Sequence, residues 1–193
     1  MVVGIAGGYC AGKDTVSLLL AERGFDIIDV DRIGHQVLEE QADAVRDAFG
    51  PEILDSGGGV DRRALGRVVF ASRGHRRTLE AILHPRMVER VERRVERAEG
   101  NTGINAALLF PMGLHRLCHA VLWVHAPLAV RIIRAVRRDR LPLCAVIGRM
   151  RSQAGIGPQH HGSDVDIYPV RNTGNSERLE QRINACLLEM GAR

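Results

Sequence analysis

The first seventeen residues of this 193-residue chain constrain its fold more than any other stretch. They begin with a short, fully apolar and largely β-branched run, Val2 to Ala6, which the glycine-rich segment GGYCAGK follows at once. A run of this kind is expected of a strand buried on both faces of a parallel sheet. A helix-like segment starts at Asp14. The order of strand, glycine loop and helix therefore predicts a parallel α/β core flanked by helices.

The glycine segment has the spacing of a phosphate-binding loop, with Gly7, four intervening residues, and then Gly12 and Lys13. Backbone N–H groups of such a loop point at phosphate oxygens, and the following helix N-terminus adds partial positive charge. Lys13 is the only lysine in a chain otherwise rich in arginine, which indicates that a compact, flexible ammonium is needed there. The next residue, Asp14, stands where the motif has Ser or Thr.

The rest of the sequence alternates between apolar strands and amphipathic helices. The first helix places Val16, Leu19 and Leu20 on one face and stops at Gly24. From about residue 33 to 100 the pattern is helical, with no convincing strand, and residues 84–100 form a long amphipathic helix. The other expected elements are strands at 25–31, 104–110, 120–127 and 166–170, helices at 130–140 and 176–190, and a mobile glycine-rich loop at 154–164.

A carboxylate ends the strand expected at 25–31. In parallel α/β sheets, ligands bind in the crevice beyond the carboxyl ends of the strands. Asp31 would point into that crevice, where it could accept a proton from a hydroxyl or help to hold magnesium. The alternative is an ordinary surface carboxylate, and Asp29 shares its face of the strand.

A cluster of arginines marks the helix expected at 130–140. At helical spacing Arg131, Arg134 and Arg138 share one face, which suits a lid that closes on a polyphosphate. A solvated helix and an RNA-binding face are the alternatives. Only 4% of the residues are aromatic, so few rings are available to stack on bases. The cluster also includes Arg137 and Arg140.

Composition favours one compact cytosolic domain. The chain is 45% hydrophobic and carries a net charge of +4, which attracts nucleic acid or anionic small molecules alike. No run approaches the roughly 20 apolar residues of a membrane span, and no secretion signal precedes the first strand.

The cysteines form no CxxC pair. The histidine pairs His115 with His119 and His160 with His161 lack a third ligand nearby, so a metal site there is not expected. The cysteines are Cys10, Cys118, Cys144 and Cys186.

Taken together, several motifs in order and spacing resemble the dephospho-coenzyme A kinase family over nearly the whole chain. They are GIAGGYCAGKDTVS, IIDVDRIGHQV, FGPEILDSGGGVDRRALGRVVF, LEAILHP, ALLFPMGL, RRD, RMRSQ and VRNTGN. The resemblance implies a P-loop kinase fold that transfers the γ-phosphoryl group of ATP to the ribose 3′-hydroxyl of dephospho-coenzyme A, with magnesium. It further implies a nucleotide-binding core at 1–32, 101–130 and 164–193, a helical acceptor-binding insertion at 33–100, and a lid at 131–163.

The resemblance also assigns roles to residues. Lys13, Asp31 and Arg138 would be catalytic, with Asp31 acting towards the 3′-hydroxyl. Asp14 and Thr15 would hold the metal. The acceptor would contact Asp31, Arg62, Arg63, His84 and Pro85. The residues implied to bind ATP are Gly8, Tyr9, Cys10, Ala11, Gly12, Lys13, Asp14, Thr15, Arg134, Arg138, Asn172 and Gly174.

Some positions depart from the family pattern. Asp14 replaces Ser or Thr, and Asn105 stands where a strand-end Asp is usual. We interpret the two as offsetting, because a carboxylate is a stronger magnesium ligand than a hydroxyl and a neutral amide avoids excess negative charge. The other departures are His35, Pro111 and Gln159. Two alternatives stay open at this point: a non-catalytic nucleotide-sensing or RNA-associated module, and a kinase for another nucleoside-like acceptor.

Overall fold

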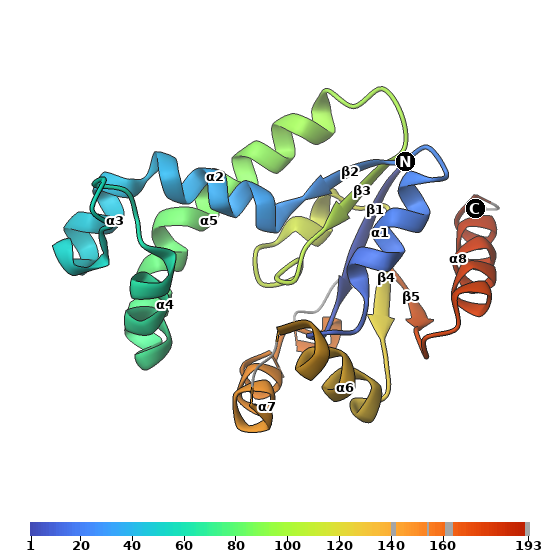
Figure 1. Cartoon of the computed structure of the whole chain (residues 1–193). Coiled ribbons are helices and arrows are strands. Elements are labelled where there is room, and N and C mark those ends of the chain that lie inside the picture. The colour runs from blue at the N-terminus through green and yellow to red at the C-terminus, as the bar shows by residue number, and fades with distance from the viewer. Residues whose placement is uncertain (140–141, 154, 161–163, 192–193) are drawn as a thin grey trace. The chain divides into compact units, whose positions relative to one another are not determined.

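The structure is a computed structural model that describes residues 1–139, 142–153, 155–160 and 164–191 (Figure 1). Within these residues the chain forms two compact units. The first comprises residues 1–29 and 95–193, and the second comprises residues 30–94. Arg140, His161 and parts of the loop expected at 154–164 lie outside the described residues. None of the described helices is long and apolar enough to span a membrane.

The first unit is built on a five-stranded sheet in the order β2-β3-β1-β4-β5, with every pair parallel. This confirms the predicted parallel α/β core. Asn105 at the carboxyl end of β3 pairs with Asp29 at the carboxyl end of β2 and with Ile5 of β1, two residues before β1 ends. The strands are β1 (Val2–Gly7), β2 (Asp26–Asp29), β3 (Thr102–Asn105), β4 (Ala120–His125) and β5 (Asp166–Arg171).

Two strands are shorter in the structure than the sequence pattern predicts. The strand expected at 25–31 ends at Asp29, and the one expected at 104–110 begins at Thr102 and ends at Asn105. The pairing of β3 with β2 ends at Asn105, and the N–H of Ala106 still donates to the carbonyl of Ile5 in β1 (3.1 Å). The apolar residues Leu109 and Phe110 are instead buried within a run of turns.

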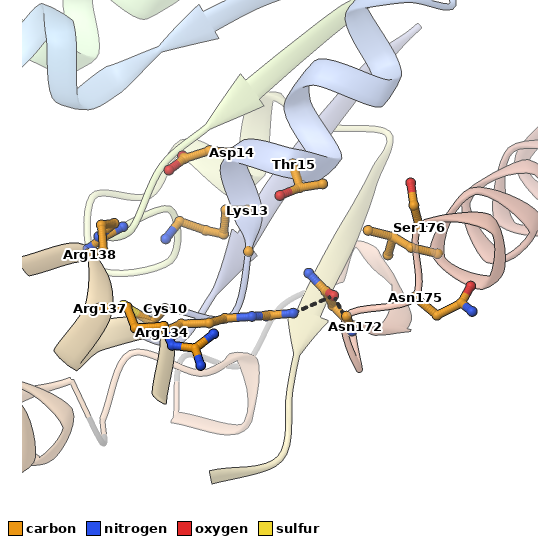
Figure 2. Close-up of a pocket in the computed structure, with 13 residues that line it drawn as sticks. Cys10, Lys13, Asp14, Thr15, Arg134, Arg137, Arg138, Asn172, Asn175 and Ser176 are labelled. Carbon is orange, nitrogen blue, oxygen red and sulfur yellow. Dashed lines mark hydrogen bonds between the residues drawn. The ribbon is translucent and has the colours of Figure 1, made fainter. Parts of the chain in front are cut away.

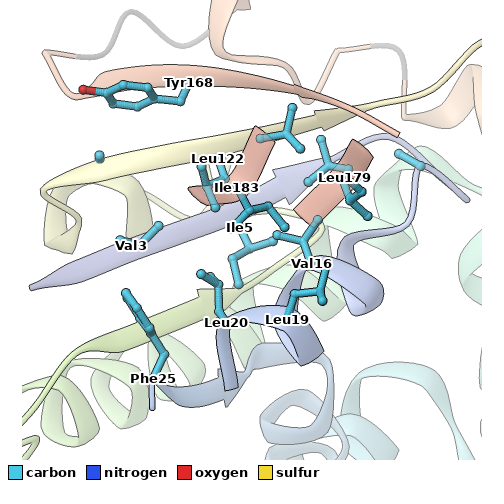
Figure 3. Packing of buried hydrophobic residues seen from close by; sticks show 14 residues of the cluster. Val3, Ile5, Val16, Leu19, Leu20, Phe25, Leu122, Tyr168, Leu179 and Ile183 are labelled. Atoms are coloured by element: carbon cyan, nitrogen blue, oxygen red, sulfur yellow. The ribbon is translucent and has the colours of Figure 1, made fainter. Parts of the chain in front are cut away.

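Helices of this unit pack on the sheet through a dry core. Val16 and Leu20 from α1 (Lys13–Ala21) and Ile183 from α8 (Ser176–Gly191) point towards Ile5 and Leu122 of the sheet, and all five are fully buried (Figure 3). This contact fixes the first turn of α1 at the end of β1. The unit also contains α6 (Leu128–Asp139), α7 (Leu143–Ser152) and the 3₁₀ turns η2 (Leu114–Leu117) and η3 (Pro158–His160).

The second unit is helical, as predicted. Asp61 caps α4 by accepting hydrogen bonds from the backbone N–H groups of Arg63 and Ala64, which lower the pKa of its carboxyl. The long helix expected from residue 84 begins earlier, at Arg73, and contains Pro85 in its interior. The unit comprises α2 (Val30–Glu40), α3 (Ala42–Phe49), η1 (Pro51–Ile53), α4 (Arg62–Ala71) and most of α5 (Arg73–Glu96).

Two leucines of α1 offer a matched test of this core. Leu20 is fully buried, whereas Leu18 is 66% exposed. We expect Leu20→Ala to lower the free energy of unfolding by about 2–5 kcal/mol, because it leaves a cavity between α1 and the sheet. Leu18→Ala should change it by no more than about 0.5 kcal/mol. Urea denaturation followed by circular dichroism measures both, and equal losses would contradict the packing described.

Candidate functional site

The glycine loop between β1 and α1 has a backbone that only particular residues allow. Gly12 has φ +98, in the left-handed region, and a Cβ built there would lie 2.2 Å from Nδ2 of Asn172. Both facts require glycine. Cys10 is the one residue other than glycine with positive φ (56) among those that the structure describes. The loop thus departs from ordinary backbone geometry at two positions, as is common where a chain wraps a ligand.

Asn172 connects the glycine loop to the segment that follows β5 through side-chain hydrogen bonds. Its buried side chain donates from Nδ2 to the carbonyl of Ala11 (3.1 Å), and its Oδ1 accepts from the N–H of Gly174 (3.2 Å). The same oxygen accepts from Nη2 of Arg134 (3.0 Å), whose Nη1 donates to Ala11 as well (3.2 Å). Figure 2 shows Arg134 reaching Asn172 from α6. Three segments far apart in the sequence therefore meet at one point.

A cavity of about 560 Å³ opens beside this point. Nine of the twelve residues that the resemblance implies for ATP binding line this cavity. The other three, Gly8, Tyr9 and Ala11, do not line it. Sequence reasoning missed Asn175, Ser176 and Leu179, and it named Arg137 in the arginine cluster without assigning it to ATP. Asn175 and Ser176 open α8, and a polar pair just before a periodic helix is a recognisable start signal. The lining residues are Cys10, Gly12, Lys13, Asp14, Thr15, Arg134, Arg137, Arg138, Asn172, Gly174, Asn175, Ser176 and Leu179.

The charge of this cavity is strongly positive. Lys13 and three arginines line it, against the single carboxylate of Asp14. The N-terminus of α1 adds partial positive charge in the same place. Preorganised N–H groups and cations of this kind attract and hold a polyphosphate anion. The arrangement can therefore bind phosphate groups and neutralise negative charge that develops on them.

Asp14 is held in place by the residue at the end of β3. Nδ2 of Asn105, which is buried, donates to Oδ1 of Asp14 at 3.2 Å. The two positions that depart together from the family pattern are thus in direct contact. A carboxylate in the first turn of α1 is favoured by the helix dipole, and its second oxygen can serve a hard cation. The exposed hydroxyl-bearing residue Thr15 is next to it.

The arginines of α6 contact the loop at several points. Arg131 donates from Nε to the carbonyl of Tyr9 (2.8 Å). The Tyr9 hydroxyl donates to Asp139, which also pairs with Arg138 (2.8 Å) and Arg149 (3.4 Å). Arg138 lies over the Tyr9 ring as well, 5.5 Å from its centroid. Arg131 and Arg134 thus donate hydrogen bonds to the loop backbone. Arg138 lines the cavity and forms an ion pair with the adjacent Asp139.

The residues expected to contact the acceptor lie in the second unit. Asp31 was expected at the end of a strand, and this prediction is wrong. It is the second residue of α2, because β2 ends at Asp29, where its partner strand β3 also ends. Arg62 pairs with Glu39 at 2.8 Å. Arg63 is the second residue of α4, and Pro85 lies inside the continuous helix α5. Burial lowers the pKa of His84, so its imidazole is neutral near pH 7.

His115, His119 and Cys118 have structural surroundings. His115 is buried in η2, and Nδ1 of His119 accepts the N–H of Val2. Across the described residues no group of three or more His, Cys, Asp or Glu side chains is arranged to hold a metal. Burial raises the pKa of the Cys118 thiol to about 12, which makes this thiol inert at neutral pH.

Comparison with known proteins gives a consistent result. A family model described as dephospho-CoA kinase matches residues 1–176. The dephospho-CoA kinase of Moorella thermoacetica is 39% identical over 160 residues, covering 79% of this chain and 76% of its own, and that of Anaeromyxobacter dehalogenans is 34% identical over 196 residues (98% and 92%).

Solved structures agree with the fold. A Thermus thermophilus protein described as TT1252 superposes with a TM-score of 0.82 at 30% identity, covering 98% of this chain and 97% of that one. Shikimate kinase from Acinetobacter baumannii superposes at 0.57 with 16% identity (97% and 93%), a likeness of fold alone.

The Asn172 contacts generate a prediction about stability. Asn172→Ala leaves the Gly174 N–H and one Arg134 nitrogen without their acceptor, so we expect the free energy of unfolding to fall by about 1–3 kcal/mol. Arg137→Ala is the control, because Arg137 lines the same cavity but is exposed; it should stay within about 0.5 kcal/mol of the parent. Thermal and urea unfolding measure both variants, and a loss confined to Arg137→Ala would refute the assignment.

Proposed function

The chain belongs to the dephospho-CoA kinase family, and we propose from this premise how its residues transfer the γ-phosphoryl group of ATP to the ribose 3′-hydroxyl of dephospho-CoA. The observation that carries the proposal is the positively charged cavity over the glycine loop, which Lys13 lines together with Arg134, Arg137 and Arg138 of α6. In phosphoryl transfer there is little covalent chemistry for a protein to do, so positioning and charge neutralisation provide most of the rate enhancement.

ATP would occupy this cavity with its phosphates on the N–H groups of the loop. Lys13 would reach the β and γ phosphates, and Arg134 and Arg138 would neutralise charge on the transferring group. The adenine end would lie towards Asn172 and Gly174, where Leu179 supplies an apolar contact. Asn172 joins the two ends, because it holds the loop and the segment after β5 together.

Magnesium would be held by Asp14, with Thr15 beside it. Magnesium prefers hard oxygen ligands, and the carboxylate of Asp14 is such a ligand at the position after the loop lysine. Held by Asp14, magnesium would supply positive charge beside the phosphates of ATP. Asn105 would act as a positioning residue, since its amide holds one oxygen of Asp14 and leaves the other for the ion.

Asp31 would orient the acceptor hydroxyl and accept its proton. Arg62, Arg63, His84 and Pro85 would bind the rest of dephospho-CoA from the helical insertion at 33–100. Residues 131–163 would close as a lid over the nucleotide-binding core at 1–32, 101–130 and 164–193. Closure would exclude water and so limit wasteful hydrolysis of ATP.

The reaction itself is tested by an assay of ADP formation with a panel of hydroxyl acceptors. We expect turnover that requires both dephospho-CoA and magnesium. Lys13→Ala should reduce kcat about 10²–10³-fold, because it removes charge stabilisation of the transferring group, whereas Leu18→Ala on the outer face of the same helix should not change it. Turnover with a different acceptor, or ATP binding without turnover, would contradict the proposal.

The role of Asp31 is tested separately. Asp31→Asn keeps the shape of the side chain but cannot accept a proton, so we expect kcat to fall about 10²-fold or more with little change in the affinity for ATP. Asp29→Asn changes the neighbouring carboxylate at the end of β2. A larger loss of kcat in Asp29→Asn than in Asp31→Asn would transfer the role to Asp29.

A double-mutant cycle tests the metal site without the acceptor. Magnesium should increase the affinity of the parent chain for ATP. We expect Asp14→Ser to reduce this increase about tenfold or more, because no carboxylate then remains next to the loop lysine. In the Asp14→Ser/Asn105→Asp variant the carboxylate returns from the other side of the same contact, and most of the affinity should return with it. Calorimetric titration of ATP at several magnesium concentrations measures each corner. Unchanged magnesium dependence in Asp14→Ser would exclude Asp14 as a ligand.

A further inference from the structure

Tyr9 belongs to the glycine loop, but its side chain does not line the cavity over that loop. The ring is buried instead, with only 8% of the residue exposed. It packs against residues of both α6 and α7, so a side chain of the phosphate loop forms part of the apolar core of these two helices. The buried cluster consists of Tyr9, Cys10, Ala135 and Val146, and Met150 packs against it.

Two arginines and a carboxylate surround the same ring. The Tyr9 hydroxyl donates to Asp139, the last residue of α6. Asp139 accepts from Nε (2.8 Å) and Nη2 (3.4 Å) of Arg138, and it pairs with Nη1 of Arg149 (3.4 Å). The guanidinium carbons of Arg138 and Arg149 lie 5.5 Å and 5.9 Å from the ring centroid, which is the range of cation–π contacts. One loop side chain therefore contacts cations of both helices.

These contacts restrict Arg138 more than its ion pair alone does. Its side chain is 56% exposed, and an exposed ion pair holds a long side chain only weakly. The Tyr9 ring adds a cation–π contact, and the Tyr9 hydroxyl holds the carboxylate with which Arg138 pairs. Because Asp139 accepts from Nε and Nη2, Nη1 of Arg138 can serve a phosphate oxygen in the cavity that Arg138 lines (Figure 2).

The backbone of Tyr9 is fixed as well. Its carbonyl accepts from Nε of Arg131 at 2.8 Å. The N–H of Ala11 donates to the carbonyl of Gly8 at 3.0 Å, which closes a four-residue turn with Tyr9 and Cys10 at its centre. A ring attached to a backbone held in this way has few positions open to it, so it links the position of the loop to that of Arg138.

We propose that Tyr9 is a positioning residue for phosphoryl transfer, whose ring and hydroxyl hold Arg138 where the guanidinium neutralises charge on the transferring group. The inference rests on the proposed function and adds to it a side chain that acts through Arg138. A cation that is held before the substrates bind loses little by reorganising during the reaction. The resemblance implied that Tyr9 binds ATP. With this assignment its backbone stays in the phosphate loop, and its side chain serves the arginine.

A double-mutant cycle on Tyr9 and Arg138 tests the assignment. The rate of γ-phosphoryl transfer from ATP to dephospho-CoA is measured in single turnovers, so that product release does not mask it. We expect Tyr9→Phe, which keeps the ring, to lower this rate about threefold to tenfold, and Tyr9→Leu to lower it about 10²-fold. In the Arg138→Gln background, Tyr9→Leu should cause no further loss. The steady-state KM for dephospho-CoA should change less than about twofold in either Tyr9 variant.

The Nε–H group of Arg138 gives a readout that needs no turnover. Its proton is hydrogen-bonded to Asp139, so its exchange with solvent can be followed in ¹H–¹⁵N NMR spectra of the full chain, where Arg138→Gln identifies the signal. We expect this exchange to be about tenfold faster in Tyr9→Leu than in the parent. Tyr9→Phe repeats both measurements with a smaller change of structure, which keeps the test valid if Tyr9→Leu does not fold.

Val146→Ala is the matched control, because Val146 is fully buried in the same cluster but is apolar and makes no hydrogen bond to the arginines. It should lower the urea midpoint of unfolding. Both the transfer rate and the exchange at Arg138 should stay within about twofold of the parent.

The outcomes separate the two proposals. If Tyr9→Leu and Arg138→Gln lower the transfer rate by independent factors, or if Val146→Ala lowers it as much as Tyr9→Leu does, Tyr9 contributes packing alone. The inference is then overturned while the proposed function stands. Unchanged exchange at Arg138 in both Tyr9 variants overturns it in the same way. If the parent chain does not phosphorylate dephospho-CoA, the proposed function fails and this inference fails with it.

Discussion

The close approach of Asn172 to Gly12 is the contact on which the site depends. Because Gly12 has no side chain, the buried amide of Asn172 can reach the carbonyl of Ala11 and hold the loop against the segment after β5. Arg134 joins the same group of atoms from α6. The loop backbone is thereby fixed before any ligand arrives, and preorganised N–H groups lose little by reorganising when phosphate binds.

The charges around the glycine loop also depend on a direct contact between two side chains. The cavity collects one lysine and three arginines against a single carboxylate, and that carboxylate is held by an amide rather than faced by a second acid. Two carboxylates at hydrogen-bond distance would repel one another in the absence of a cation. The Asp14–Asn105 pair places one negative charge at the position next to Lys13, which is the charge that a magnesium ligand requires.

Local pattern in the sequence was enough to predict the parallel α/β core, the phosphate loop and the helical character of the segment from about residue 33, because periodicity and glycine placement act over a few neighbouring residues. It did not predict where β2 and β3 end, since a strand ends where its partners end and the partners lie far away in the chain. For the same reason it did not assign Arg137, Asn175, Ser176 and Leu179 to the cavity over the glycine loop. The sequence by itself determined which groups could bind phosphate. Only the tertiary structure decided which of them meet, because packing of α1, α6 and α8 around the sheet brings residues more than 150 positions apart, such as Ala11 and Asn172, into hydrogen-bond contact.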